Sequence, residues 1–136
     1  SRNSPEQLRE ILETVRTIAL VGASDKPHRP SHEVMAYLQG RGYRVIPVNP
    51  RLAGKTLLGE TVYADLASVP GTIDMADLFL APNHTDPVID TAIEKGIPVV
   101  WMQIGVNNET GARRAENAGI SVVMDRCPKQ EIPRLF

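Results

Sequence analysis

The residues best suited to chemistry in this chain follow short apolar runs. The first run, Thr17 to Val21, stops at the small residues Gly22-Ala23-Ser24, and Lys26 comes shortly after. A strand, a small-residue turn and a helix form the first half of a nucleotide-binding βαβ unit, because small residues let phosphates approach backbone N–H groups. The fingerprint G-x-G-x-x-G is incomplete, since Ser24 and Pro27 occupy its second and third glycine positions. This turn alone is therefore a weak indication of a phosphate site.

The second apolar run ends in a basic segment. Residues 44–48 are followed by Asn49-Pro50-Arg51 and then by Lys55. An NAD-binding domain needs a carboxylate at this place, about 20 residues past the glycines, to hold the ribose hydroxyls. Arg51 and Lys55 suit a phosphate on the ribose instead, which favours NADP or another ligand with a phosphorylated adenosine ribose. The alternative is that both are solvated loop charges, which are common on protein surfaces.

Two further runs also end in small or polar residues, at 81–83 and at 104–105. The carboxyl ends of parallel strands meet at one edge of a sheet, where ligands of open α/β folds bind. Glycine, proline and asparagine are common in turns of any kind, so each of these segments alone could be an ordinary turn. Four of them at one edge of the sheet favour a ligand-binding site. The predicted ligand-contacting positions are Gly22, Ala23, Ser24, Lys26, Asn49, Pro50, Arg51, Lys55, Ala81, Pro82, Asn83 and Gly105.

Groupings typical of catalysis or metal binding are sparse. Cys127 could act as a nucleophile if the fold brought a base such as His28, His32 or His84 close to it, but a small buried thiol is the commoner role. His28 and His32 have i, i+4 spacing, yet no second cluster of metal-ligating residues accompanies them. We therefore predict no catalytic residue and no metal site.

The elements that must position these residues alternate between strand and helix patterns. We expect strands at 17–21, 44–48, 76–80, 99–102 and 120–124. Ser31 is expected to cap a helix reaching about 39, Asp86-Pro87 to open one that ends at Gly96, and Asn107 or Asn108 to cap one that ends at Gly119. A loop is expected at 51–60, a short strand at 62–63, a short helix at 65–69 and a helical turn at 129–135.

These strands are continuous apolar runs rather than alternating ones, which indicates a parallel sheet covered on both faces. Because crossovers between parallel strands are right-handed, we predict a Rossmann-like, doubly wound α/β fold of about five strands. One domain is expected to span 1–136. Within it, residues 1–16 form an extra N-terminal helix on the sheet, with Ser4 and Gln7 as a capping box.

Bulk composition narrows the range of partners. The 136 residues include 15 basic and 16 acidic ones, intermixed, so no basic stripe suggests nucleic acid. No apolar run approaches the ~18 residues of a membrane span, and the polar N-terminus does not read as a signal peptide. The single cysteine cannot form an internal disulfide, which favours the cytoplasm.

Several motifs together resemble the CoA-binding domain family, small stand-alone proteins similar to the N-terminal domain of the succinyl-CoA synthetase α subunit. The resemblance covers about 17–133, and Gly105-Val106-Asn107 takes the place of the synthetase's Thr-Glu-Gly turn. The motifs that carry it are Val21-Gly22-Ala23-Ser24, Val48-Asn49-Pro50, Gly54-Lys55 with Leu58-Gly59, and Asp125-Arg126-Cys127-Pro128.

The resemblance implies that coenzyme A lies across the strand ends. Residues 22–24 and Lys26 would approach its pyrophosphate or pantetheine. Residues 49–51 would meet the adenosine, which carries a 3′-phosphate, and residues 81–83 would line the groove for adenine and pantetheine. The synthetase's phosphorylated histidine domain and its ATP-grasp partner lie outside this sequence, so synthetase activity is not carried over.

Three hypotheses follow from the sequence. The leading one is a CoA or acyl-CoA binding protein without catalysis of its own. The second is an enzyme, either NADP-dependent or using the thiol of Cys127. The third is a regulatory or assembly module whose nucleotide site is empty, and a homodimer or an unidentified protein partner remains open in each case.

Overall fold

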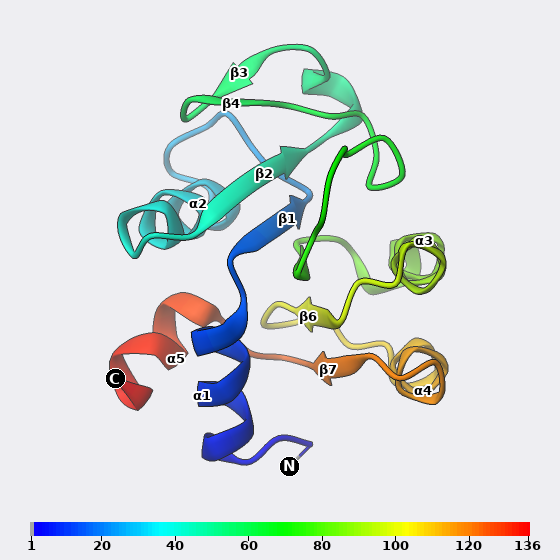
Figure 1. Cartoon of the computed structure of the whole chain (residues 1–136). Helices are drawn as coiled ribbons and strands as arrows, with labels where there is room; N and C mark the ends of the chain where they lie inside the picture. Colours follow the sequence, from blue (N-terminus) through cyan, green and yellow to red (C-terminus); the bar gives the residue numbers. More distant parts are fainter. Residues whose placement is uncertain (1) are drawn as a thin grey trace.

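The computed structural model describes residues 2–136. Five parallel strands form one sheet in the order β2-β1-β5-β6-β7 (Figure 1). The strands of this sheet are β1 Thr17–Val21, β2 Arg44–Val48, β5 Met75–Leu78, β6 Val99–Met102 and β7 Ser121–Val123. The helices are α1 Pro5–Thr14, α2 Pro30–Gly40, α3 Asp86–Lys95, α4 Glu109–Asn117 and α5 Pro128–Leu135. This confirms the predicted Rossmann-like fold.

The helices form two layers around the sheet. Side chains of α1, α2 and α5 share one apolar core with one face, and side chains of α3 and α4 share a second core with the other. The chain runs outward from β1 to β2 and then returns to β5 on the other side of β1. The order of strands therefore reverses between β1 and β5, and a crevice is expected above this switch point.

Most of the predicted helix ends are confirmed. Ser4 Oγ accepts a hydrogen bond from the Gln7 backbone N–H at 3.2 Å, and Gln7 Oε1 accepts one from Ser4 N–H at 2.9 Å, which is the predicted capping box. Gly96 ends α3 in a left-handed conformation. Asn108, rather than Asn107, caps α4, because its side chain accepts from Gly111 N–H.

Three local predictions were wrong. Helix α2 begins at Pro30, so Ser31 is a buried first-turn residue and not the cap. Residues 65–69 form turns, in which the Asp65 carboxylate accepts from Ser68 N–H, instead of a helix. The loop expected at 51–60 contains the short hairpin β3 Thr56–Leu57 and β4 Glu60–Thr61, followed by a single bridge from Tyr63 to Val48. Each of these differences involves only a few residues.

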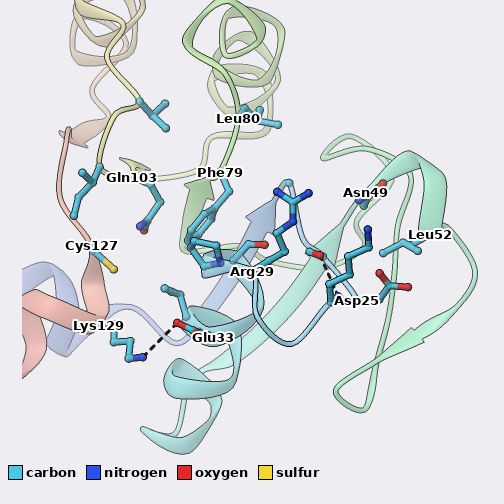
Figure 2. Close-up of a pocket in the computed structure, with 18 of the residues that line it drawn as sticks. Asp25, Arg29, Glu33, Asn49, Leu52, Phe79, Leu80, Gln103, Cys127 and Lys129 are labelled. Carbon is cyan, nitrogen blue, oxygen red and sulfur yellow. Dashed lines mark hydrogen bonds and ion pairs between the residues drawn. The ribbon is translucent and has the colours of Figure 1, made fainter.

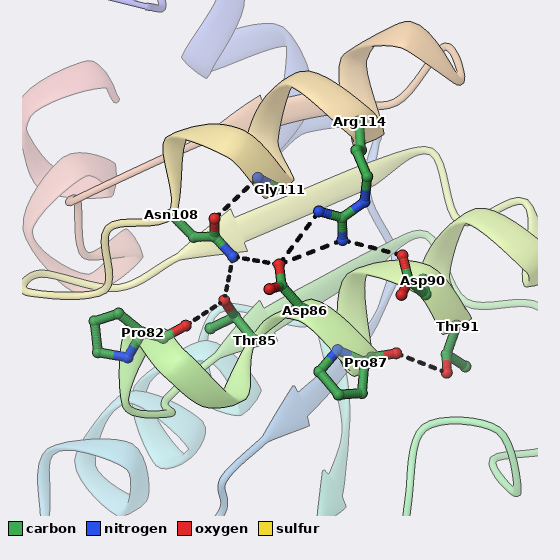
Figure 3. A network of polar contacts seen from close by, with 9 residues as sticks. All are labelled: Pro82, Thr85, Asp86, Pro87, Asp90, Thr91, Asn108, Gly111 and Arg114. Atoms are coloured by element: carbon green, nitrogen blue, oxygen red, sulfur yellow. Dashed lines mark hydrogen bonds and ion pairs between the residues drawn. The ribbon is translucent and has the colours of Figure 1, made fainter.

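A polar network ties α3 to α4 on the second sheet face (Figure 3). Asn108 Nδ2 donates to Thr85 Oγ1 at 2.8 Å and to Asp86 Oδ1 at 2.7 Å. Thr85 Oγ1 donates in turn to the Pro82 carbonyl at 2.7 Å, and Arg114 pairs with Asp86 and Asp90. The hydrogen bond from Asn108 and the charge of Arg114 lower the pKa of Asp86. The network fixes the short 3₁₀ turn Pro82–His84 that leads into α3.

Gly22 occupies the tightest contact at the switch point. Its φ is +95°, and a Cβ built on it would lie 2.1 Å from the Phe79 carbonyl oxygen. Both the left-handed backbone and this approach exclude a side chain. The small residue at the end of β1 is therefore required by the neighbouring strand.

We predict that Gly22→Ala lowers the free energy of unfolding by about 3 kcal/mol, because it adds backbone strain and a clash with main chain. Urea denaturation measures the change. The matched control is Gly54→Ala, since Gly54 has a φ of +85° but open space around it. The control is expected to cost about 1 kcal/mol, from strain alone. An equal decrease in the free energy of unfolding in the two variants would contradict the role of the close contact between Gly22 and the Phe79 carbonyl.

Asp77 is an ionisable residue in the centre of the sheet. It lies in β5 between Leu20 and Trp101 of the adjacent strands and is completely buried. Neither of its carboxylate oxygens has a hydrogen-bond partner in the described chain. Burial therefore raises the pKa of Asp77 well above its ordinary value of 3.8.

We predict that Asp77→Asn stabilises the protein near neutral pH. A carboxyl group whose pKa is raised by folding favours the folded state fully below its unfolded pKa, and this contribution is lost as the pH rises through the folded pKa. The increase in the free energy of unfolding caused by Asp77→Asn should therefore be absent below pH 3.8 and should grow as the pH rises above it. Thermal unfolding of the wild-type protein and of Asp77→Asn across a pH series measures the difference in stability. A stabilisation that does not vary with pH would refute the role of the Asp77 carboxyl.

Candidate functional site

A cleft of about 1060 Å³ opens at the carboxyl edge of the sheet, over the ends of β1, β2, β5 and β6 (Figure 2). We call it the strand-end cleft. It lies above the reversal of strand order, which is where ligands of doubly wound folds bind. Of the predicted positions, the structure brings Gly22, Ser24, Lys26, Asn49 and Arg51 to its wall.

The other predicted positions do not line the cleft. Ala23 is buried beneath the turn, and Pro50 and Lys55 are exposed beyond it. Residues 81–83 are exposed where the chain turns toward α3, and Gly105 N–H is bound to the Asp125 carboxylate at 2.7 Å. For these seven residues the contact with a ligand stays a prediction.

In the turn after β1, the backbone N–H groups that are free to bind a ligand are not those of the small residues Gly22 and Ala23. Gly22 N–H and Ala23 N–H both donate to the Val48 carbonyl, at 3.0 and 3.1 Å, so they are already satisfied. Within the part of the chain that the structure describes, Ser24 N–H and Asp25 N–H have no acceptor. The donors free to meet an anion are therefore one residue further along, beside the first turn of α2.

Asn49 joins the ends of the two strands. Its Nδ2 donates to the Ala23 carbonyl at 2.7 Å, and its Oδ1 accepts from Arg51 N–H at 2.8 Å. The second bond caps the short 3₁₀ turn Pro50–Leu52. Asn49 therefore positions Arg51 at the cleft rather than offering a free amide to a ligand.

Charge is concentrated in the half of the cleft formed by β1 and β2. Lys26, Arg29 and Arg51 line it, and none of the three forms an ion pair with another described residue. Asp25 lies among them, while Glu33 is paired across the mouth with Lys129, at 3.9 Å between Oε2 and Nζ. Cations outnumber carboxylates around the strand ends, so this half attracts anions.

The opposite half, over β5 and β6, is largely apolar. Sequence reasoning missed its walls, because their residues are ordinary core types until the chain bends away from the sheet. Strand β5 stops at Leu78, two residues earlier than predicted, so Phe79 and Leu80 face the cleft. The remaining residues of this half are Gln103, Ile104, Val106 and Cys127, and Lys129 and Gln130 of α5 line the cleft beside them.

No histidine lines the cleft among the described residues, so none of the three proposed bases faces the thiol of Cys127 from its wall. Residues 2–136 also contain no group of three or more His, Cys, Asp or Glu side chains that could hold a metal ion. No helix in this part of the chain has the length and apolar character of a membrane span.

The fold and the cleft define a Rossmann-like α/β domain whose open site lies at the carboxyl edge of its parallel sheet. A family model described as a CoA binding domain matches residues 16–133, and the chain belongs to that family. The resemblance stated from the motifs is thereby confirmed.

Similar proteins include both stand-alone chains and parts of larger enzymes. The uncharacterized protein YneT of Bacillus subtilis is 36% identical over 126 residues, which are 93% of this chain and 92% of that one. A Thermus thermophilus structure described as cell-free ID.343 has a TM-score of 0.94 at 37% identity and covers 98% of this chain and 100% of that one. The α subunit of ADP-forming acetate–CoA ligase II of Pyrococcus furiosus is 26% identical over 123 residues, 82% of this chain but 26% of the subunit.

We predict that Asn49→Ala lowers the free energy of unfolding by about 1–2 kcal/mol, because it removes one hydrogen bond that connects the ends of β1 and β2 and one that caps the turn Pro50–Leu52. The matched control is Asn83→Ala, an exposed turn residue, which should change stability by less than about 0.5 kcal/mol. Chemical denaturation compares them. A similar effect of both substitutions would show that the bonds of Asn49 do not hold the turn.

Proposed function

We propose that this protein binds coenzyme A, free or as an acyl thioester, along the strand-end cleft and catalyses no reaction of its own. The main observation behind the proposal is the residue that follows β2. Arg51 lines the cleft there, at the place where an NAD-binding domain has a carboxylate. Membership of the CoA binding domain family supports the same ligand class.

The adenosine is proposed to lie over the end of β2. Arg51 is exposed, lines the cleft and has no carboxylate partner in the described chain, so its guanidinium is available to a phosphate. The 3′-phosphate on the ribose of coenzyme A is its proposed partner, since a guanidinium binds phosphate with two parallel hydrogen bonds. Leu52 beside it offers an apolar contact for the base.

The pyrophosphate is proposed to lie over the turn between β1 and α2. Lys26 and Arg29 supply positive charge there. The backbone N–H groups of Ser24 and Asp25, which have no acceptor among the described residues, are further donors that a phosphate could use. The first turn of α2 opens on the same place, and helix N-termini favour anions. The pantetheine arm then extends over β5 and β6 into the apolar half.

The similar acetate–CoA ligase subunit suggests a component of an acyl-CoA enzyme, but this chain spans about a quarter of that subunit. We therefore propose binding alone and leave ligase activity with the longer proteins. We also propose a cytoplasmic location, because a single unpaired cysteine suits a reducing compartment.

Calorimetric titration with coenzyme A and with 3′-dephospho-CoA tests the proposal. Arg51→Gln is expected to weaken coenzyme A binding by about tenfold to a hundredfold, the loss of one charge-assisted contact, and to leave 3′-dephospho-CoA binding unchanged. The matched control is Lys55→Gln, because Lys55 carries the same charge outside the cleft. Because Lys55 lies off the cleft wall, we expect Lys55→Gln to change neither affinity, and the measurement also tests the contact that the sequence predicts for Lys55.

Three outcomes would contradict parts of this assignment. Absence of coenzyme A binding at millimolar concentration overturns the function. Equal weakening by Arg51→Gln and Lys55→Gln shows a general charge effect rather than a contact. Tighter binding of NADPH than of coenzyme A favours the NADP-dependent alternative, because both ligands carry a phosphorylated adenosine ribose.

A further inference from the structure

Cys127 lies at the end of the strand-end cleft opposite Arg51. It is 7% exposed, lines the cleft and forms no disulfide. Two bonds from β6 hold the segment before it, since Trp101 Nε1 donates to the Arg126 carbonyl at 2.8 Å and Arg126 N–H donates to the Met102 carbonyl at 3.3 Å. The Cys127 carbonyl accepts from Gln130 and Glu131 N–H in α5, whereas the side chain makes no capping bond. These bonds fix the backbone around Cys127, while its side chain lines the cleft.

Gln103 provides a second, independent sign of a ligand in this half. It follows β6, is 6% exposed and lines the same wall as Cys127 (Figure 2). Its Oε1 is buried without a donor from any described residue. A buried amide oxygen without a hydrogen bond is unfavourable, and an N–H group of a ligand could supply the bond that the described chain does not. The pantetheine arm carries two amide N–H groups on the way to its thiol.

The order of the strands sets the direction in which such a ligand would extend. From the end of β2 to the end of β6 the sheet takes three steps, β2 to β1 to β5 to β6, or about 14 Å at about 4.8 Å a step. An adenosine at Arg51 and a pyrophosphate at Lys26 therefore direct the remaining arm toward Gln103 and Cys127. Its terminal sulfur then comes to the only cysteine of the chain.

We propose, resting on the coenzyme A binding proposed above, that Cys127 undergoes thiol–disulfide exchange with disulfides of coenzyme A. The Cys127 sulfur attacks the near sulfur of the ligand's disulfide. The ligand's S–S bond breaks, a bond forms between that sulfur and Cys127 Sγ, and the departing thiol takes up the proton that Cys127 gives up. One disulfide replaces another, so no further oxidant is needed. Acyl transfer to Cys127 is disfavoured, because the described residues that line the cleft include no histidine to act as a base.

The experiment incubates reduced protein with coenzyme A disulfide and follows the intact mass over time. A single addition of one coenzyme A moiety is expected, reversed by dithiothreitol and absent in Cys127→Ser. Exchange should be at least about tenfold faster than with glutathione disulfide, which lacks the nucleotide that places the sulfur. Gln103→Leu should slow exchange with coenzyme A disulfide by about tenfold and leave exchange with glutathione disulfide unchanged.

Calorimetry with Cys127→Ser separates the two proposals. If Cys127→Ser binds coenzyme A while the wild-type protein gains no mass, the exchange is overturned and the binding function stands. If neither binds coenzyme A and both disulfides react at one rate, Cys127 is an ordinary reactive thiol and both proposals fall. If the dithiothreitol-sensitive adduct forms but Gln103→Leu slows both disulfides alike, the role given to the Gln103 amide is overturned.

Discussion

The contact between the end of β1 and its two neighbours determines the shape of the cleft. Gly22 N–H and Ala23 N–H donate to the Val48 carbonyl of β2, and the Phe79 carbonyl on the β5 side lies where a Gly22 side chain would be. The three strand ends can converge in this way because position 22 has no Cβ. Their convergence directs Asn49 to the Ala23 carbonyl, starts the turn that carries Arg51, and sends Phe79 toward the cleft.

The same geometry divides the cleft into two chemical halves. Over β1 and β2 the chain supplies unpaired cations and unsatisfied N–H groups. Over β5 and β6 it supplies mainly apolar side chains, with the buried Gln103 amide among them and the ion-paired Lys129 at the edge. A ligand that suits both halves must be anionic at one end and uncharged at the other. Coenzyme A has this distribution, with its phosphates near the adenosine and its thiol at the far end of an uncharged arm.

The fold followed closely from the sequence, and the site followed in part. The spans of β1, β2 and β6 were predicted to the residue, because apolar runs bounded by glycine, proline or asparagine leave little freedom. The sequence also predicts ligand contacts for Ala81, Pro82 and Asn83. The structure shows these residues exposed and off the cleft wall, and their contact with a ligand stays a prediction. Their direction depends on the network of Thr85 and Asn108, which joins residues far apart along the chain.

The amino-acid sequence by itself determined the alternation of elements, the family and the basic character of the segment after β2. These are properties of neighbouring residues, and periodicity and motifs record them. Only the tertiary structure decided which backbone donors remain free, that Arg51 lines the cleft while Lys55 does not, and that Gln103 and Cys127 share one wall. Those facts depend on how separate strand ends are paired across the sheet, and no local pattern carries that information.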